Sequence, residues 1–170
     1  NAVDSIGDTA LIKSCRKGHS KVVALLLGAG AEVDKARDDG VTPLSIACEG
    51  DHVEVALLLI DRGATIDKAA DDGRDPLYIA CEKGQLECAR LLLEAGAAVS
   101  QASNNGSTPL FAASHFGHLE VAKLLSSYGA SRAAVPPFGT PEEIATSRGH
   151  ADIAAWLVAS RGWTPLAHLE

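Results

Sequence analysis

Residues 40–67, GVTPLSIACEGDHVEVALLLIDRGATID, carry the pattern that decides the fold, because the chain repeats this pattern. Similar stretches begin at Gly7, Gly73 and Gly106, so that each copy starts 33 residues after the one before it. A fifth copy, FGTPEEIATSRGHADIAAWLVASRG, follows a loop that has lost one position, and WTPLAHLE begins an incomplete sixth. A fixed period of this length is typical of solenoids, in which small units stack along one axis.

Each copy predicts two short antiparallel helices. The first helix is expected to begin at Thr42-Pro43, since a Thr hydroxyl accepts a free first-turn N–H and Pro needs no donor there. It is expected to end at a residue that tolerates a left-handed conformation, which in the second copy is Asp51. The other copies have glycine at that point: Gly18, Gly84, Gly117 and Gly149. The second helix is rich in leucine and stops at Gly30, Gly63, Gly96 or Gly129.

The repeated unit resembles the ankyrin repeat, with its Thr-Pro-Leu, its Gly-His turn, its leucine-rich helix and its Gly-Ala ending, as in residues 39–69. The resemblance implies an all-α ankyrin-repeat solenoid of about five stacked helix-turn-helix units with β-turn or hairpin loops. We expect one domain over residues 1–170, with a terminal tail or incomplete sixth start at 163–170. The expected repeats are 4–36, 37–69, 70–102, 103–134 and 135–162.

The chain departs from the family pattern at two kinds of position. The histidine that follows Thr-Pro-Leu in the family is absent from every copy, so the hydrogen bond it makes with Thr is not expected. Its place is taken by Ile12, Ser45, Tyr78, Phe111 and Glu143. Polar residues at Lys13-Ser14 and Glu142-Glu143 replace apolar ones, which predicts terminal caps. Asn1-Ala2, in contrast, falls where a preceding repeat would end, and we expect a fragment of a longer protein.

Composition narrows the classes of partner. The net charge is −7, and no Lys/Arg-rich run offers a surface for phosphate, so nucleic acid is not expected as a partner. No apolar run reaches the roughly 20 residues that cross a bilayer, and we expect a soluble monomer without membrane insertion. The four cysteines are expected to be reduced thiols of an intracellular protein, whether cytoplasmic or nuclear.

No pattern of residues predicts catalysis, a cofactor or a metal site. The cysteines recur in the repeat instead of forming close pairs, and a spacing of roughly 8–10 Å between stacked helices separates such positions. The histidines after the turn glycine form a row for the same reason. Asp38-Asp39 and Asp71-Asp72 both precede a turn glycine, where Asp favours tight turns. We therefore expect a protein that is not an enzyme.

The resemblance implies that a partner meets the concave side, which is formed by the loop tips and the exposed part of each first helix. Carried over position by position, this concave strip consists of Asp38, Asp39, Glu49, Asp71, Asp72, Arg74, Tyr78, Glu82, Asn104, Asn105, Phe111, His115 and Phe116. Its first half is acidic and its second half is aromatic. Contact with a partner is favoured for Phe116, whereas contact and local packing are equally open for Tyr78 and Phe111.

Two hypotheses for function follow. The leading one is a non-catalytic protein–protein interaction module that binds a protein or peptide carrying basic and apolar groups along the concave strip. The alternative is a structural spacer within a longer ankyrin-repeat or multidomain protein, whose binding or catalysis lies elsewhere. Neither the fold nor the sequence identifies the partner.

Overall fold

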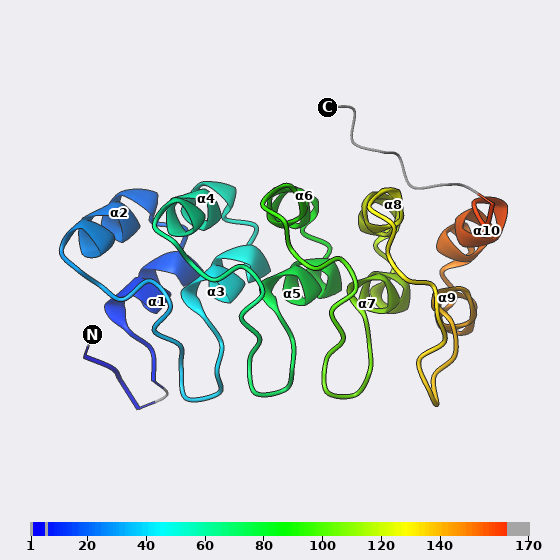
Figure 1. Cartoon of the computed structure of the whole chain (residues 1–170), viewed down its shortest axis with the longest axis horizontal. Coiled ribbons are helices and arrows are strands. Elements are labelled where there is room, and N and C mark those ends of the chain that lie inside the picture. Colours follow the sequence, from blue (N-terminus) through cyan, green and yellow to red (C-terminus); the bar gives the residue numbers. More distant parts are fainter. Residues whose placement is uncertain (1, 6, 163–170) are drawn as a thin grey trace.

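The computed structural model describes residues 2–5 and 7–162, and within them ten α-helices form five antiparallel pairs (Figure 1). The pairs are α1 (Ala10–Arg16) and α2 (Ser20–Gly28), α3 (Pro43–Glu49) and α4 (Val53–Asp61), α5 (Pro76–Lys83) and α6 (Leu86–Glu94), α7 (Pro109–Phe116) and α8 (Leu119–Ser127), and α9 (Pro141–Arg148) and α10 (Ala151–Ala159). This arrangement confirms the all-α solenoid expected from the sequence.

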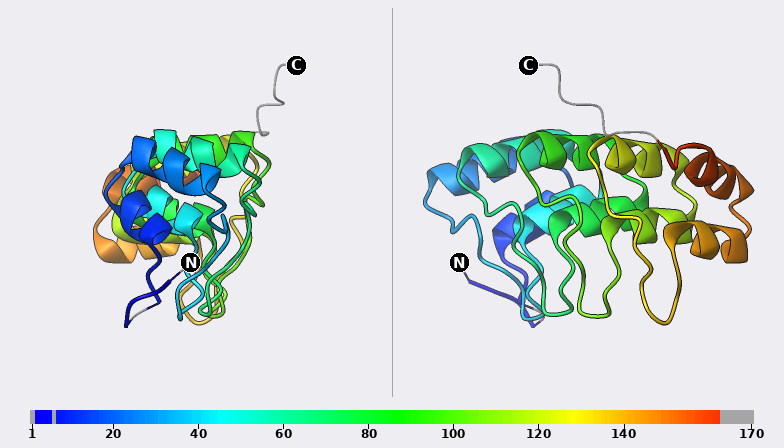
Figure 2. Two further views of the ribbon diagram at one scale, coloured as in Figure 1. Left: turned by 90° about the vertical axis from the view of Figure 1, so that its left-hand side faces the viewer. Right: turned by 45° about the vertical axis from the view of Figure 1, so that its right-hand side comes forward.

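The helices lie in two layers. The odd-numbered helices form an inner layer and the even-numbered helices an outer layer, while hairpin loops project from the inner layer at an angle to the helices (Figures 1 and 2). The hairpins are narrow, and the structure gives isolated bridges from Val3 to Thr9 and from Val135 to Gly139. None of the described helices is long and apolar enough to span a bilayer.

Local hydrogen bonds confirm where the inner helices begin. The N–H of Ser45 donates to Oγ1 of Thr42 at 3.1 Å, and the N–H of Tyr78 donates to a carboxylate oxygen of Asp75 at 2.6 Å. Thr9, Thr108 and Thr140 cap their helices in the same way. In the second unit Ser45 also brings its hydroxyl within 3.0 Å of the Thr42 hydroxyl, so a hydrogen bond forms at a position where the family has histidine. Each first-turn donor that a cap satisfies contributes about 1 kcal/mol.

The exits of the inner helices also follow the prediction. Gly84 has a φ of 75°, and Asp51, which replaces glycine in the second unit, has a φ of 53°. In the fourth unit Gly117 is required for two reasons. Its φ is positive, and the ring of His150 leaves no room for a side chain there. A Cβ at Gly117 would come within 2.7 Å of Cε1 of that ring.

The histidines at the helix turns connect neighbouring units. Nε2 of His118 lies 3.0 Å from the carbonyl oxygen of Glu82, and Nε2 of His150 lies 3.0 Å from that of His115. His52 makes the same contact, and the side-chain amide of Gln85 donates to the carbonyl of Glu49 at 2.9 Å. These side chains form the expected row, in which each one satisfies a carbonyl at the end of the preceding inner helix.

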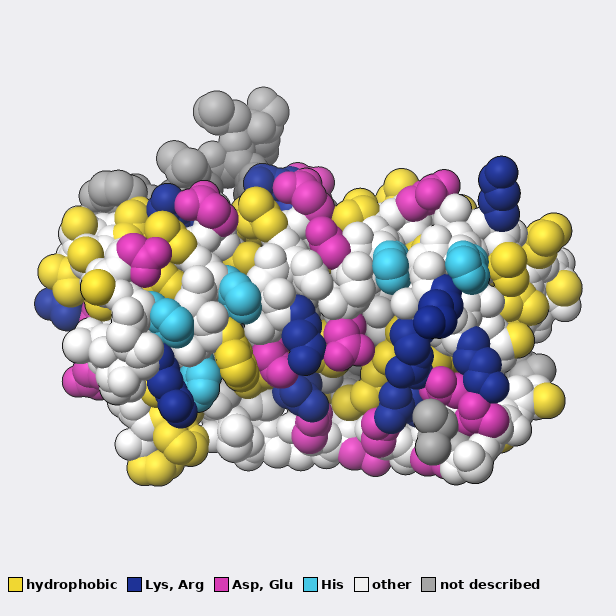
Figure 3. Space-filling model, turned by 180° about the vertical axis from the view of Figure 1, so that it is seen from behind, with side chains coloured by type: hydrophobic (Ala, Val, Ile, Leu, Met, Phe, Trp, Pro, Cys, Tyr) yellow, Lys and Arg dark blue, Asp and Glu magenta, His cyan; other side chains and the backbone are white. Residues whose placement is uncertain are grey.

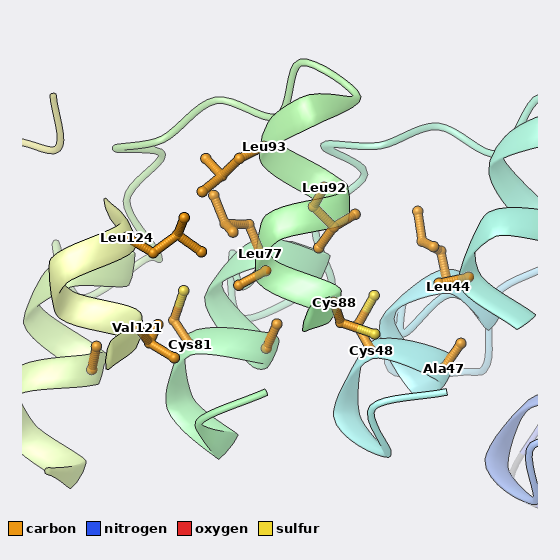
Figure 4. Close-up of a cluster of buried hydrophobic side chains, with 14 of the residues drawn as sticks. Leu44, Ala47, Cys48, Leu77, Cys81, Cys88, Leu92, Leu93, Val121 and Leu124 are labelled. Atoms are coloured by element: carbon orange, nitrogen blue, oxygen red, sulfur yellow. The ribbon is translucent and has the colours of Figure 1, made fainter. Parts of the chain in front are cut away.

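The core runs continuously through the stack. Leu44, Leu77 and Leu110 are no more than 1% exposed. Leu92, from the outer layer, belongs to the same buried cluster, and Figure 4 shows it with Leu44 and Leu77. Because each unit contributes small aliphatic side chains to both of its interfaces, stability arises from neighbouring pairs rather than from any pair alone.

The N-terminal end of the stack is capped in one layer only. In the inner layer Lys13 is exposed and its Nζ lies 2.8 Å from Asp4, as a polar cap requires. In the outer layer Val22 and Leu25 are 43% and 73% exposed, whereas Val55, at the position equivalent to Val22, is 1% exposed. The expected N-terminal cap is thus incomplete, because the leucine-rich pattern of the outer helix continues to the end of the stack.

Candidate functional site

The inner helices and the hairpins meet at an angle, and the face that they share forms a groove. Two hollows in this face are lined by strip residues of the third and fourth units: Asp72, Arg74, Tyr78, Glu82, Asn104, Asn105, Phe111, His115 and Phe116. The other predicted strip residues, Asp38, Asp39, Glu49 and Asp71, line neither hollow. Figure 3, which views the molecule from behind Figure 1, shows acidic and basic side chains side by side on this face instead of a continuous acidic patch. Most carboxylates in the acidic half of the strip form ion pairs within the chain, whereas the aromatic half contains both buried and exposed side chains.

Most acidic residues of the strip are paired with cations of the same chain. Arg74 contacts Asp72 at 2.6 Å and Glu82 at 2.7 Å. Arg37 contacts Asp39 at 2.7 Å, and Lys83 lies 3.7 Å from Glu49. Burial acts in the opposite direction, but the hydrogen bonds from Arg74 keep the pKa of Asp72 below its ordinary value. The acidic half of the strip therefore offers fewer free carboxylates than its sequence indicates.

Asp38 and Asp71 are the exceptions in the acidic half. Both side chains are exposed, and the structure gives neither an ion pair within residues 2–5 and 7–162. Each stands first in its Asp-Asp pair, beside the glycine of the preceding hairpin: a Cβ at Gly40 would come within 2.6 Å of Oδ1 of Asp71. Carboxylates at these two tips remain available to a cation from outside the chain.

The second residue of each tip has the turn-forming role that the sequence predicts. Oδ1 of Asp39 accepts from the N–H of Val41 at 3.2 Å, and Oδ1 of Asp72 accepts from the N–H of Arg74 at 3.0 Å. The hairpins also contact one another. The N–H of Asn104 donates to the carbonyl of Asp72 at 3.0 Å, and its side-chain amide donates to that of Asp71 at 2.8 Å. These bonds hold the tips in a row.

The aromatic half divides into buried and exposed side chains. Tyr78 and Phe111 are 8% and 5% exposed, which favours the local-packing alternative for both. Phe111 forms a small core with Val135 and Ile144. Phe116 is 49% exposed, and its ring centroid lies 4.6 Å from that of His115. Only Phe116, of the three strip aromatics, presents a large apolar surface to solvent.

Phe138 belongs to the same cluster, although sequence reasoning did not include it. Its ring is 50% exposed and its centroid lies 6.1 Å from that of Phe111. The N–H of Phe138 donates to the carbonyl of Val135, as the N–H of Gly106 does to that of Ser103. Phe138 thus occupies the hairpin position of a glycine, two residues before the capping Thr. This register is the sequence signal that would have pointed to Phe138.

These aromatic residues surround a hollow in the groove, with a volume of about 290 Å³. The residues that line it come from the inner helices and hairpins of the last three units: Arg74, Tyr78, Glu82, Asn105, Ser107, Phe111, Ala112, His115, Phe116, Phe138, Ile144 and Arg148. Burial, together with the nearby charges of Arg148 and His150, lowers the pKa of His115 below its ordinary value. At neutral pH His115 is an uncharged wall of the hollow.

The cysteines are buried thiols, and all four are free. Burial raises the pKa of Cys15 to about 12. The thiols of Cys48 on α3 and Cys88 on α6, the outer helix of the following unit, are hydrogen-bonded to each other (Figure 4). The repeat spacing did not predict this proximity. This hydrogen bond and burial together raise the pKa of Cys48 well above its ordinary value. Among the described residues, no group of three or more His, Cys, Asp or Glu side chains is arranged to hold a metal ion.

A family model described as ankyrin repeats (3 copies) matches residues 1–70 and 62–135. No curated protein was found to match the chain.

Proposed function

The chain belongs to the ankyrin repeat family, and we propose that it is a non-catalytic module that binds a protein or peptide partner through its groove. Ankyrin repeats are generally protein–protein interaction modules and are generally not enzymes. The observation that carries the proposal is the pair Phe116 and Phe138, each about half exposed at the hollow of about 290 Å³. The aromatic hollow supplies affinity, and the charges around it set register and association rate.

The groove has the features of an interface anchor. Exposed aromatic side chains that flank a concave apolar surface are the usual hot spots of protein interfaces, and truncating one costs 2 kcal/mol or more, as an order of magnitude. Phe111 and Ile144 form a fixed floor beneath them. The partner brings an apolar group to the hollow and basic groups to the free carboxylates of Asp38 and Asp71. We propose that the chain acts as a monomer in a reducing, intracellular compartment, where its four thiols stay reduced.

The test uses a partner captured from extract of the source cells and two matched triple variants. The groove variant combines Asp38→Asn, Asp71→Asn and Phe116→Ala, and the hairpin position of Asn104 shows that Asn fits at the Asp sites. The control on the outer helices combines Glu54→Gln, Glu94→Gln and Leu57→Ala, with the same change in charge and an equally exposed apolar residue. We expect the groove variant to bind at least tenfold more weakly and the control to bind within twofold, by the hot-spot scale. Equal losses in both variants would contradict the proposal.

A second candidate function is the structural spacer. The exposed side chains of Val22 and Leu25 favour it, because the residues equivalent to Val22 in the next three units, Val55, Cys88 and Val121, are all buried. A further helix pair seated on α2 would bury both. If Leu25→Glu leaves stability unchanged in this chain but destabilises a longer natural form, the spacer function gains support; equal effects in both forms would oppose it.

A further inference from the structure

We propose that the hollow takes an apolar side chain from a partner segment that carries a carboxylate next to it, and that Arg148 binds this carboxylate. The inference rests on the proposed function and specifies the partner at that same groove. It differs from the expectation of a purely basic and apolar partner, because it places an acidic group at the fifth unit.

The carboxylates on the three inner helices that line the hollow, α5, α7 and α9, already have partners in the described part of the chain. Glu82 on α5 receives Nη1 of Arg74 at 2.7 Å and Nζ of Lys83 at 3.5 Å. On α9, Glu142 pairs with Arg161 at 2.9 Å. Glu143 accepts from the N–H of Thr140 at 2.7 Å within a capping box. Helix α7 carries no Asp or Glu.

Arg148 is a cation without such a partner. It lies in the last turn of α9, it is exposed, and it lines the hollow. The structure gives it no ion pair with any residue of 2–5 or 7–162. Its neighbour His115 supplies no negative charge, and the nearby His150 uses its ring nitrogen on a backbone carbonyl. A carboxylate from a partner therefore gains an ion pair with Arg148 without displacing one that already exists.

The hollow itself specifies an apolar side chain. Its floor is formed by Phe111 and Ile144, which pack with Val135 in a buried cluster, and its rim is formed by the exposed side chains of Phe116 and Phe138. Polar groups on the opposite wall are committed, since Arg74 is held by Asp72 and Glu82. A volume of about 290 Å³ is enough for a Leu, Met or Phe side chain with part of its backbone.

The positions of the unpaired charges of Arg148 and Asp71 also set the order and spacing of charged residues in the partner segment. Arg148 belongs to the fifth unit, whereas Asp71 belongs to the hairpin of the third. With units roughly 10 Å apart, these charges are separated by about 20 Å, which an extended segment spans in about six residues. The segment would place its acidic residue and apolar anchor at the fourth and fifth units and a basic residue about six positions away.

The experiment selects peptides on the full chain from a displayed library of random peptides, each about 12 residues long so that the six-residue separation fits. The best peptide is then titrated by fluorescence anisotropy against the parent chain and against Phe116→Ala, Arg148→Glu and Arg62→Glu. Arg62 is the cap residue that follows α4 in the outer layer; it is exposed and does not line the hollow, so it is the control for reversing a charge. Circular-dichroism melting curves establish that each variant is folded.

We expect enriched peptides to carry Asp or Glu beside a large apolar residue. We expect Arg148→Glu and Phe116→Ala each to weaken binding about tenfold or more, and Arg62→Glu to leave it within twofold, on the scale of close charge pairs. Selection on Arg148→Glu should enrich Lys or Arg in place of the acid. If Phe116→Ala weakens binding but Arg148→Glu does not, this inference is wrong and the proposed function stands. If neither does, both are wrong, and failure to enrich any peptide would overturn the inference of a linear segment.

Discussion

The ring of Phe138, in the hairpin of the fifth unit, packs against the ring of Phe111, in the inner helix of the fourth unit, and the two ring centroids are 6.1 Å apart. One ring is half exposed and the other is almost completely buried, so the pair joins the core of the stack to its groove. The buried ring fixes the position of the exposed one. Aromatic pairs at this separation contribute roughly 0.5–1.5 kcal/mol beyond the area that they bury.

Replacing Phe138 with Ala should weaken partner binding by about tenfold or more, because an exposed aromatic anchor at the hollow is lost. Leu57→Ala is the matched control, since Leu57 is a similarly exposed apolar residue on α4. Titration calorimetry with the captured partner measures both variants. A control that loses as much affinity as Phe138→Ala would argue against an anchor in the groove.

Gly117→Ala should destabilise the fold more than Gly96→Ala does. Both glycines have positive φ, at 87° and 92°, so both substitutions carry the left-handed penalty of about 1 kcal/mol. Only at Gly117 would the new Cβ meet the ring of His150, whereas Gly96 has nothing within 4 Å. Overpacking adds about 1–3 kcal/mol at Gly117. Urea unfolding of both variants tests this, and equal losses would show that the histidine ring moves aside freely.

Asp75→Thr should raise stability at neutral pH. Asp75 is 1% exposed, and its Oδ2 has no hydrogen-bond partner among the described residues. Burial raises the pKa of this carboxyl to about 6 from an ordinary 3.8. The folded protein therefore binds a proton here where the unfolded chain does not, and the free energy of unfolding falls as pH rises from 3.8 to about 6. Thr abolishes this fall and contributes on the order of 1–3 kcal/mol at pH 7.

The mirror substitution is Thr42→Asp, at the equivalent buried cap of the second unit. It should lower stability at pH 7 by a similar amount and introduce the same pH dependence. Urea unfolding at several pH values between 4 and 7 compares both variants with the parent chain. A parent chain whose stability does not fall over this range would contradict a buried carboxyl with a raised pKa.

The fold could be predicted because its determinants are local and repeated. Thr42 caps its helix through a hydrogen bond to a residue three positions away, and Gly84 gives its helix exit a positive φ. Thr or Asp recurs at the capping position and Gly or Asp at the exit. The exposed outer face at Leu25 could not be predicted in the same way. Whether a leucine of an outer helix is buried depends on a neighbouring unit, and both α2 and α4 carry the same run Val-Ala-Leu-Leu-Leu.

The candidate site was predicted as a row of positions but not as a distribution of free charge. Glu82 lines the hollow, and its pairing with Arg74, eight residues away, depends on the side-chain conformations of both. Phe138 was missed because the shortened loop puts it at a glycine position. The contact between Cys48 and Cys88 joins the inner helix α3 to α6, the outer helix of the following unit. Comparing only residues 33 positions apart therefore does not reveal it.

The central claim is that a partner binds in the groove, and hydrogen–deuterium exchange of the chain with and without its captured partner tests it most directly. The account predicts that binding slows exchange in α7 and in the hairpin at residues 134–140, with little change in the outer helices α4, α6 and α8. Slower exchange in those outer helices, with none in α7 or the hairpin, would contradict it.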